Sequence, residues 1–148
     1  MPETVNSSAR SSAKPRPGTM RLVHALQYRL PLAGVVSILH RASGAMMFAL
    51  LPLIIWFFDV SLTSEITFER FTSAFEFGIG FVPGVLVKVV VLGLIWAFLH
   101  HFIAGVRHLW MDATHSVSKE FGRRSAVVTL AASVLLTLLL GAKLFGLY

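Results

Sequence analysis

Residues 81–112 read FVPGVLVKVVVLGLIWAFLHHFIAGVRHLWMD, an apolar run that ends in a group of polar side chains. Only Lys88 and the adjacent pair His100 and His101 interrupt the apolar part, residues 81–106. A hydrocarbon core of roughly 30 Å needs about 20 helical residues, and an isolated strand would leave its backbone groups unsatisfied in lipid. This stretch therefore predicts a membrane-spanning helix.

Two further segments of the same kind flank it. Residues 42–58 carry no charged side chain, and residues 126–148 carry only Lys143. The chain of 148 residues is 14% charged, whereas a soluble domain is about 25% charged, and without cysteine it has no thiolate metal site. The sequence predicts an all-α integral membrane three-helix bundle within residues 20–148, with helices at about 32–58, 82–112 and 125–146.

The basic residues lie beside the expected spans. Residues 1–19 are rich in Ser, Arg, Lys and Pro and predict a disordered basic tail without a signal-peptide core. The first connection, residues 59–80, holds only Arg70 among its Lys and Arg positions, whereas the basic residues collect before the first span and in the second connection. The positive-inside rule then predicts a cytoplasmic N-terminus and a periplasmic C-terminus. The net charge of +6 indicates membrane lipid as a partner rather than nucleic acid.

One face of the second expected helix carries four residues spaced i, i+4, i+7 and i+11: His101, Gly105, His108 and Asp112. Ionisable groups inside a membrane are functional candidates because lipid does not solvate them. Neutral imidazole is a haem ligand, and a glycine one turn away leaves room for a porphyrin. His101 is therefore the favoured axial ligand, with a hydrogen-bonded core histidine as the alternative. His100 is expected to be a packing or interfacial residue, and a second ligand is expected from another subunit.

The first expected helix has its own polar stripe. Ser37 and Arg41 are one turn apart and can both reach a carbonyl or an anionic group. Gly44 permits the close approach of another helix or of a flat ligand, although ordinary small-residue packing explains it too. By topology this stripe shares a leaflet with the polar end of the second helix. Asp112 is then either part of an interfacial ion pair or a carboxylate that orients His108 or Arg41 or relays protons.

Two motifs on these helices resemble the signatures of one family. Residues 37–44, SILHRASG, match the S-I-x-H-R-x-[ST]-G signature of the succinate dehydrogenase cytochrome b subunit, the large membrane anchor of complex II. Residues 101–112 match its second signature, H-x-x-x-G-x-R-H-x-x-x-D, and Arg16 with Pro17 resembles its N-terminal R-P. The resemblance covers roughly residues 16–148, but the segment after R-P departs from the family pattern and reads GTMRLVHALQYR.

The resemblance implies a subunit of a succinate:quinone oxidoreductase that holds haem b together with a second small membrane anchor subunit. His101 is then the ligand of the haem iron, and His40, Arg41 and His108 lie in the haem propionate region. Ser37 and Arg41 line the ubiquinone site near the iron–sulfur subunit. Succinate oxidation belongs to the flavoprotein subunit, so this chain carries no dicarboxylate chemistry. The bacterial inner membrane is the expected location, ahead of the mitochondrial inner membrane.

Other classes of function compete with this interpretation. A small membrane transporter or proton-relay protein would use the same His, Arg and Asp cluster. Such a protein needs polar residues across the membrane, whereas the outer half here is apolar apart from Lys88 and Lys143. A haem-free anchor of a related complex is the closer alternative, and a purely structural bundle leaves the charges of one leaflet unexplained.

Overall fold

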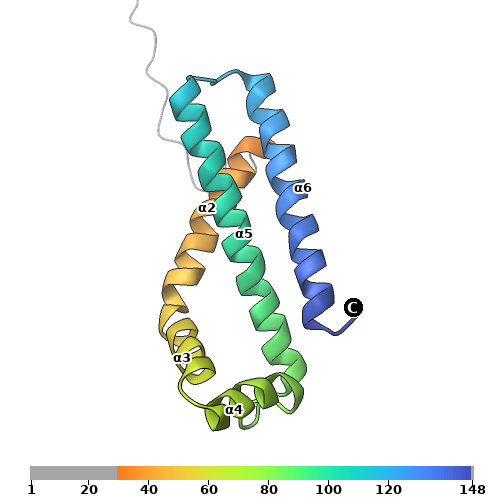
Figure 1. Cartoon of the computed structure of the whole chain (residues 1–148). Helices are drawn as coiled ribbons and strands as arrows, with labels where there is room; N and C mark the ends of the chain where they lie inside the picture. Colours follow the sequence, from red (N-terminus) through yellow and green to blue (C-terminus); the bar gives the residue numbers. More distant parts are fainter. Residues whose placement is uncertain (1–29, 148) are drawn as a thin grey trace, which may run out of the picture.

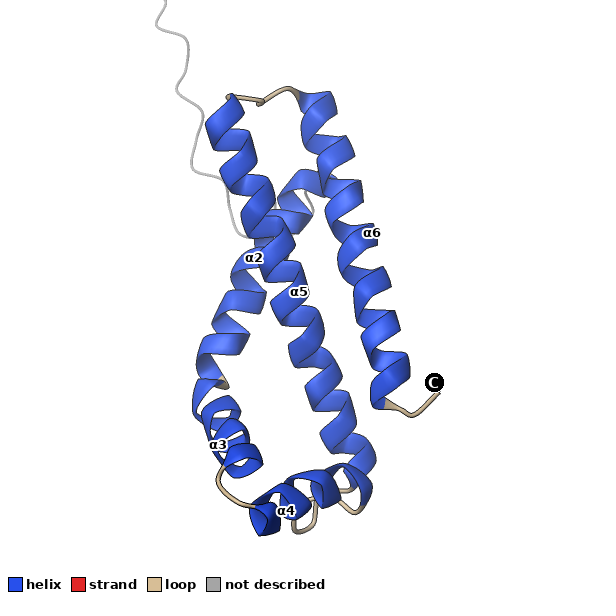
Figure 2. Cartoon of the chain, viewed as in Figure 1, coloured by secondary structure: helices blue, strands red, loops and turns tan. Residues whose placement is uncertain are grey.

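The computed structural model describes residues 30–147. The expected basic tail, the Arg16–Pro17 motif and the segment after it, residues 18–29, lie outside the described residues. Figures 1 and 2 show a helical structure, in which the described residues form five helices: α2 (Leu32–Ala49), α3 (Leu51–Leu62), α4 (Glu65–Glu76), α5 (Gly84–Thr114) and α6 (Lys119–Leu144). The all-α prediction is confirmed, but the predicted number of three helices is wrong. Three of the five, α2, α5 and α6, are long and apolar enough to cross a membrane.

The expected first span, residues 32–58, is two helices. Pro52 is the second residue of α3. It has no N–H to donate to the Phe48 carbonyl, and its ring crowds that carbonyl, so one regular helix cannot run through this point. Leu50 takes φ −92° and ψ 2° and ends α2. Figure 1 shows α2 passing behind α5 from the side of α6, with α3 following it towards α4.

The first connection contains a helix that its composition did not suggest. The side chain of Ser64 accepts from the Thr67 backbone N–H at 3.2 Å, and the side chain of Thr67 accepts from the Ser64 N–H at 2.9 Å. This reciprocal capping box satisfies donors that the first turn of α4 would otherwise leave free. Figure 1 shows α4 lying across the end of the bundle where α3 ends and α5 begins.

The second connection is shorter than expected because α6 begins at Lys119. Ser118 caps it, since its hydroxyl accepts from the Phe121 N–H at 3.2 Å. Residue 125, the predicted start of this helix, lies inside it instead. Pro83 is the N-cap residue of α5. The helix therefore begins at Gly84, two residues after the predicted start at residue 82.

The buried core is small and is made where α2, α5 and α6 meet. Val36, Ala104 and Ala126 contribute one buried side chain from each of these helices. Small side chains let helix backbones approach closely in lipid, where no hydrophobic force drives them together. Most large apolar side chains face outward, as a chain surrounded by lipid requires. The small core places the polar side chains of α2 next to those of α5.

Candidate functional site between α2 and α5

Three imidazoles gather where α2 packs against α5. The ring of His40 stacks on the ring of His101, with 4.1 Å between centroids and 13° between planes. The centroid of His108, two turns further along α5, lies 5.3 Å from that of His40. All three side chains are half-buried. The structure thus brings together the histidines of both sequence motifs.

The two stacked rings each lie beside a glycine of the opposite helix. A Cβ atom added to Gly44 would lie 2.8 Å from Cε1 of His101, closer than real Cβ atoms approach other atoms. A Cβ atom added to Gly105 would lie 3.5 Å from Nε2 of His40, which is ordinary contact. A larger residue at position 44 would therefore make the His101 ring or the helix shift. The space beside Gly105, which the sequence suggested for a porphyrin, holds the His40 ring.

The hydrogen bonding of His101 decides which ring nitrogen carries its proton. Nδ1 lies 2.9 Å from the backbone oxygen of His40 and 3.4 Å from Oγ of Ser43. A carbonyl oxygen only accepts, so Nδ1 donates to it, and the Ser43 hydroxyl donates to the same oxygen at 2.9 Å. The lone pair of a neutral His101 is then on Nε2, which has no hydrogen-bond partner among the described residues. Metal-binding histidines are held in this way, with the second nitrogen bonded to a carbonyl.

Ser43 is a residue of this site that sequence reasoning missed. Its side chain is fully buried, and it contacts both histidine partners, the His40 carbonyl and the His101 ring. Its place in the SILHRASG motif was the signal that marked it, but serine in a membrane helix is also common in plain helix packing.

His100 lies on a different side of α5 and is fully buried. Its Nδ1 is 3.3 Å from Oγ of Ser133 on α6, and its ring stacks on Trp96 with 5.4 Å between centroids. The Ser133 hydroxyl donates to the Leu130 carbonyl at 3.0 Å, so the imidazole Nδ1–H is the donor to Ser133. His100 is therefore a packing residue, which is one of the two roles expected for it. The hydrogen bond to Ser133 of α6 was not expected.

Arg107 makes its hydrogen bonds to α6, although its charge also acts on His108. Arg107 is 8% exposed, and its Nε donates to Oγ of Ser125 at 2.9 Å. Its Nη2 donates to the carbonyl of Gly122 at 3.2 Å. Both acceptors lie near the start of α6, so this guanidinium joins α5 to α6.

The remaining candidates surround the cluster. Ser37 is half-buried on α2, and Arg41 and Asp112 are exposed. Arg41 and Asp112 both interact electrostatically with His108. Neither Arg41 nor Asp112 forms an ion pair within residues 30–147. The ion pair in this part of the chain joins Glu120 and Arg124 of α6. The Arg41 guanidinium is therefore exposed and without an ion pair in this part of the chain.

The cluster is not a cage for a bare metal ion. Among the residues that the structure describes, no group of three or more His, Asp or Glu side chains is arranged to hold one. A single open Nε2 on His101 instead fits a group that needs one imidazole from this chain. The fold and the site together define a helical integral membrane protein whose ionisable groups meet at one end of its spans.

Comparison with known proteins places the chain within this class. The sequence profile described as "Succinate dehydrogenase/Fumarate reductase transmembrane subunit" matches residues 14–140. The chain is 33% identical over 116 residues to the succinate dehydrogenase cytochrome b556 subunit of Paracoccus denitrificans. The aligned residues cover 78% of this chain and 84% of that relative. The subunit of the same name from Coxiella burnetii is 28% identical over 78% of this chain and 87% of the relative. The subunit of the same name from Rickettsia felis is 24% identical, over 79% of this chain and 86% of the relative.

The chain belongs to the family of succinate dehydrogenase/fumarate reductase transmembrane subunits. The resemblance carried by its two motifs is thereby confirmed. The chain is an integral membrane subunit with three candidate spans among its described residues.

Proposed function

We propose that this chain is the cytochrome b anchor of a succinate:quinone oxidoreductase and that His101 is an axial ligand of haem b. One observation supports the proposal: Nδ1 of His101 is bonded to the His40 carbonyl at 2.9 Å, which leaves the Nε2 lone pair for coordination. The names of the relatives, cytochrome b556 subunits, support a haem of this type.

A second small anchor subunit would supply the other ligand of the haem iron. His101 lies at the border between the buried side of α5 and an exposed apolar strip formed by Phe98, Phe102 and Leu109, which are 60%, 62% and 71% exposed. Such a strip in a membrane helix suits a partner helix, because van der Waals packing drives helix association in lipid. His40, Arg41 and His108 lie close by and supply the donors that a pair of haem propionates needs. When bound, haem b supplies a one-electron carrier.

Ser37 and Arg41 form the quinone-binding part of the site. Their hydroxyl and guanidinium groups are donors one turn apart on α2, and a quinone carbonyl accepts such hydrogen bonds. A quinone reduced by two electrons takes up two protons. Asp112, exposed and near His108, is placed to orient that imidazole or to pass a proton through it. Electrons come from the iron–sulfur subunit, and succinate is oxidised in the flavoprotein subunit.

The location follows from the same argument. Three candidate spans require a membrane, and the named relatives are bacterial, which supports the bacterial inner membrane. A transporter or proton relay is less well supported. Towards α3 and α4 the helices surround a hollow lined by thirteen apolar residues, which offers no relay path.

The first experiment is a reduced-minus-oxidised absorption spectrum of the purified complex, with its subunits identified by mass. We expect a b-type signal that His101→Leu abolishes or shifts and that His115→Leu, in the exposed second connection, leaves unchanged. A normal spectrum in His101→Leu would remove this residue as the ligand. Four subunits without haem would define a haem-free anchor, and the absence of partner subunits would favour the relay.

A further inference from the structure

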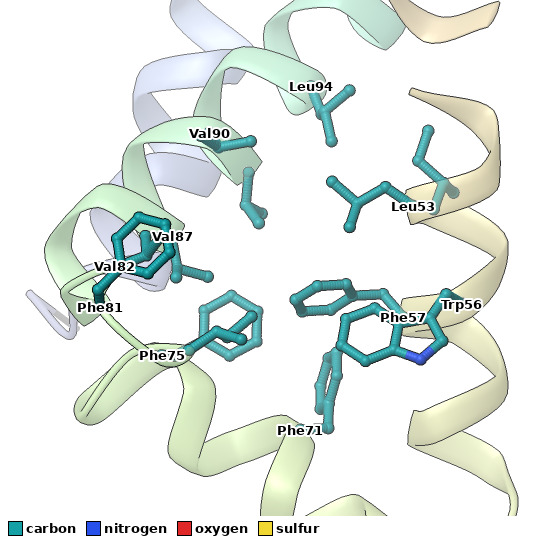
Figure 3. Close-up of a pocket in the computed structure, with 13 residues that line it drawn as sticks. Leu53, Trp56, Phe57, Phe71, Phe75, Phe81, Val82, Val87, Val90 and Leu94 are labelled. Atoms are coloured by element: carbon teal, nitrogen blue, oxygen red, sulfur yellow. The ribbon is translucent and has the colours of Figure 1, made fainter. Parts of the chain in front are cut away.

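A cavity of about 550 Å³ lies between α3, α4 and α5, towards the opposite end of α5 from the imidazole cluster. Figure 3 shows side chains from all three helices directed into it, with Leu94 at one end and the rings of Phe57, Phe71 and Phe75 at the other. These rings contact one another edge to face, with centroids 5.2 to 6.3 Å apart. Aromatic pairs of this geometry are stabilising, so contacts among the three rings stabilise this end of the cavity.

A second hollow of about 440 Å³ adjoins the first and is partly polar. The two share four lining residues, Trp56, Phe57, Phe71 and Ile79. The polar lining of the second comes from three residues of α4: Thr67, Arg70 and Ser73.

Arg70 is the charged donor of this polar hollow. The hydroxyl of Thr67 donates to the Ser64 carbonyl at 2.9 Å, and that of Ser73 donates to the Arg70 carbonyl at 2.9 Å. Both hydroxyl protons are thus already used. The Arg70 guanidinium forms no ion pair within residues 30–147. An anionic group in this hollow would therefore meet Arg70 first.

The carboxylates of α4 lie on its other side. Glu65, Glu69 and Glu76 are spaced i, i+4 and i+11 and share one face of the helix. None of them lines the polar hollow, whereas Arg70 and Phe71 line it together. The charge of Arg70 towards the hollow is therefore not cancelled by its acidic neighbours, although the connection as a whole is acidic.

We propose that the two hollows form one binding site for an anionic phospholipid. One acyl chain occupies the apolar cavity, and the phosphate lies at Arg70. The cavity lining carries no group that would recognise a polar head, so it selects hydrocarbon, which the bilayer supplies. Guanidinium binds phosphate through parallel hydrogen bonds. An amphipathic helix across the end of a bundle, with its phenyl rings directed inwards, is also positioned at the depth of lipid head groups.

The test uses photolabelling of the intact complex in vesicles. The probe is a trace of phosphatidylglycerol with a diazirine in the middle of one acyl chain, and labelled peptides are mapped by mass spectrometry. We expect adducts on the α3 and α5 segments that line the cavity. Phosphatidylcholine with the same chain should label several-fold less. Arg70→Gln should reduce phosphatidylglycerol labelling about fivefold, the loss expected for about 1 kcal/mol per basic residue near anionic lipid.

Matched variants separate the site from general lipid contact. Val91→Phe fills the cavity and should abolish labelling there, whereas Val89→Phe changes the same helix outside the cavity and should not. Lys143→Gln removes a cation from α6, outside both hollows, and should leave labelling unchanged. Equal labelling by both lipids, persistence of labelling in Val91→Phe, or no labelling because a partner subunit covers the cavity would each overturn the proposal.

Discussion

The imidazoles of His40 and His101 stack with 4.1 Å between their centroids, and each lies beside a glycine of the other helix. The His40 carbonyl also accepts the Nδ1–H of His101. The orientation of the proposed ligand is therefore set by the backbone of α2 as well as by its own helix. A change in the approach of α2 to α5 should be visible at His101.

Gly44 offers the most direct test of this coupling. In Gly44→Ala the added Cβ would lie 2.8 Å from Cε1 of His101, so the ring or the helix must move. Overpacking of this kind costs about 1–3 kcal/mol. We expect a lower midpoint of thermal denaturation of the purified complex and a shifted b-type absorption band.

Gly93→Ala is the control, because nothing lies within 4 Å of an added Cβ there. Alanine favours a helix over glycine by roughly 1 kcal/mol, so this variant should be as stable as the parent or more so. Equal behaviour of the two variants would show that the stacked histidines do not depend on Gly44.

Arg41→Ala should lower quinone reductase activity while leaving succinate oxidation by an artificial dye intact. Arg41 is exposed and unpaired within the described residues, and a hydrogen bond from a charged group contributes about 1.5–3 kcal/mol. A loss of about tenfold or more in quinone turnover is expected from that contribution. Lys143→Ala provides the comparison with a cation outside the site. Unchanged quinone turnover in Arg41→Ala would contradict the assigned role.

Ser133→Ala should destabilise the complex without altering the haem spectrum. It removes the partner of the fully buried His100 Nδ1, and an unsatisfied buried donor costs about 1–3 kcal/mol. Thermal denaturation of the complex measures the effect. Ser61→Ala, which removes only an exposed hydrogen bond to the Phe58 carbonyl, should change the midpoint little. A shifted haem spectrum in Ser133→Ala would place His100 nearer the haem than its contacts with α6 indicate.

Arg107→Met should loosen the contact between α5 and the start of α6. The Gly122 carbonyl and the Ser125 hydroxyl would each lose a donor, and the methionine chain keeps much of the buried volume. We expect a lower denaturation midpoint and an unchanged haem midpoint potential. A clear fall in that potential would mean that Arg107 acts on the haem, contrary to its contacts.

The spans and the site were predictable from sequence to different degrees. Long apolar runs define α5 and α6 because a bilayer admits few alternatives for such segments. The helical period also placed His101 and His108 on one side of α5 and His100 on another. What failed depended on local backbone chemistry: Pro52 divides the first span into two helices, and the last helix begins at Lys119, after its cap Ser118, rather than at residue 125.

Contacts between helices were the harder part. The partner of Arg107 depends on the rotation of α6. The buried face of α6 is a stripe of small residues about one turn apart: Gly122, Ala126, Thr129, Ser133, Thr137 and Gly141. Small residues mark a face that packs against a helix, but they do not name the side chain that it meets. The filling of the space beside Gly105 by His40 depends on how closely α2 approaches, and this distance is fixed by several small residues together. A motif reports which residues matter, but the angle between two helices decides which of them meet.

The break at Leu50 has a consequence for the bilayer. With 18 residues α2 is about 27 Å long, slightly short of an average hydrocarbon core, while α5 with 31 residues extends to about 46 Å. The α3 helix continues across the membrane from the end of α2, and the break at Leu50 is a joint between the two helices. A bilayer that thins or thickens can therefore be matched by a change of angle at Leu50, at a cost of fractions of a kcal/mol per Å. The stacked histidines, which lie on the other side of this joint, need not move.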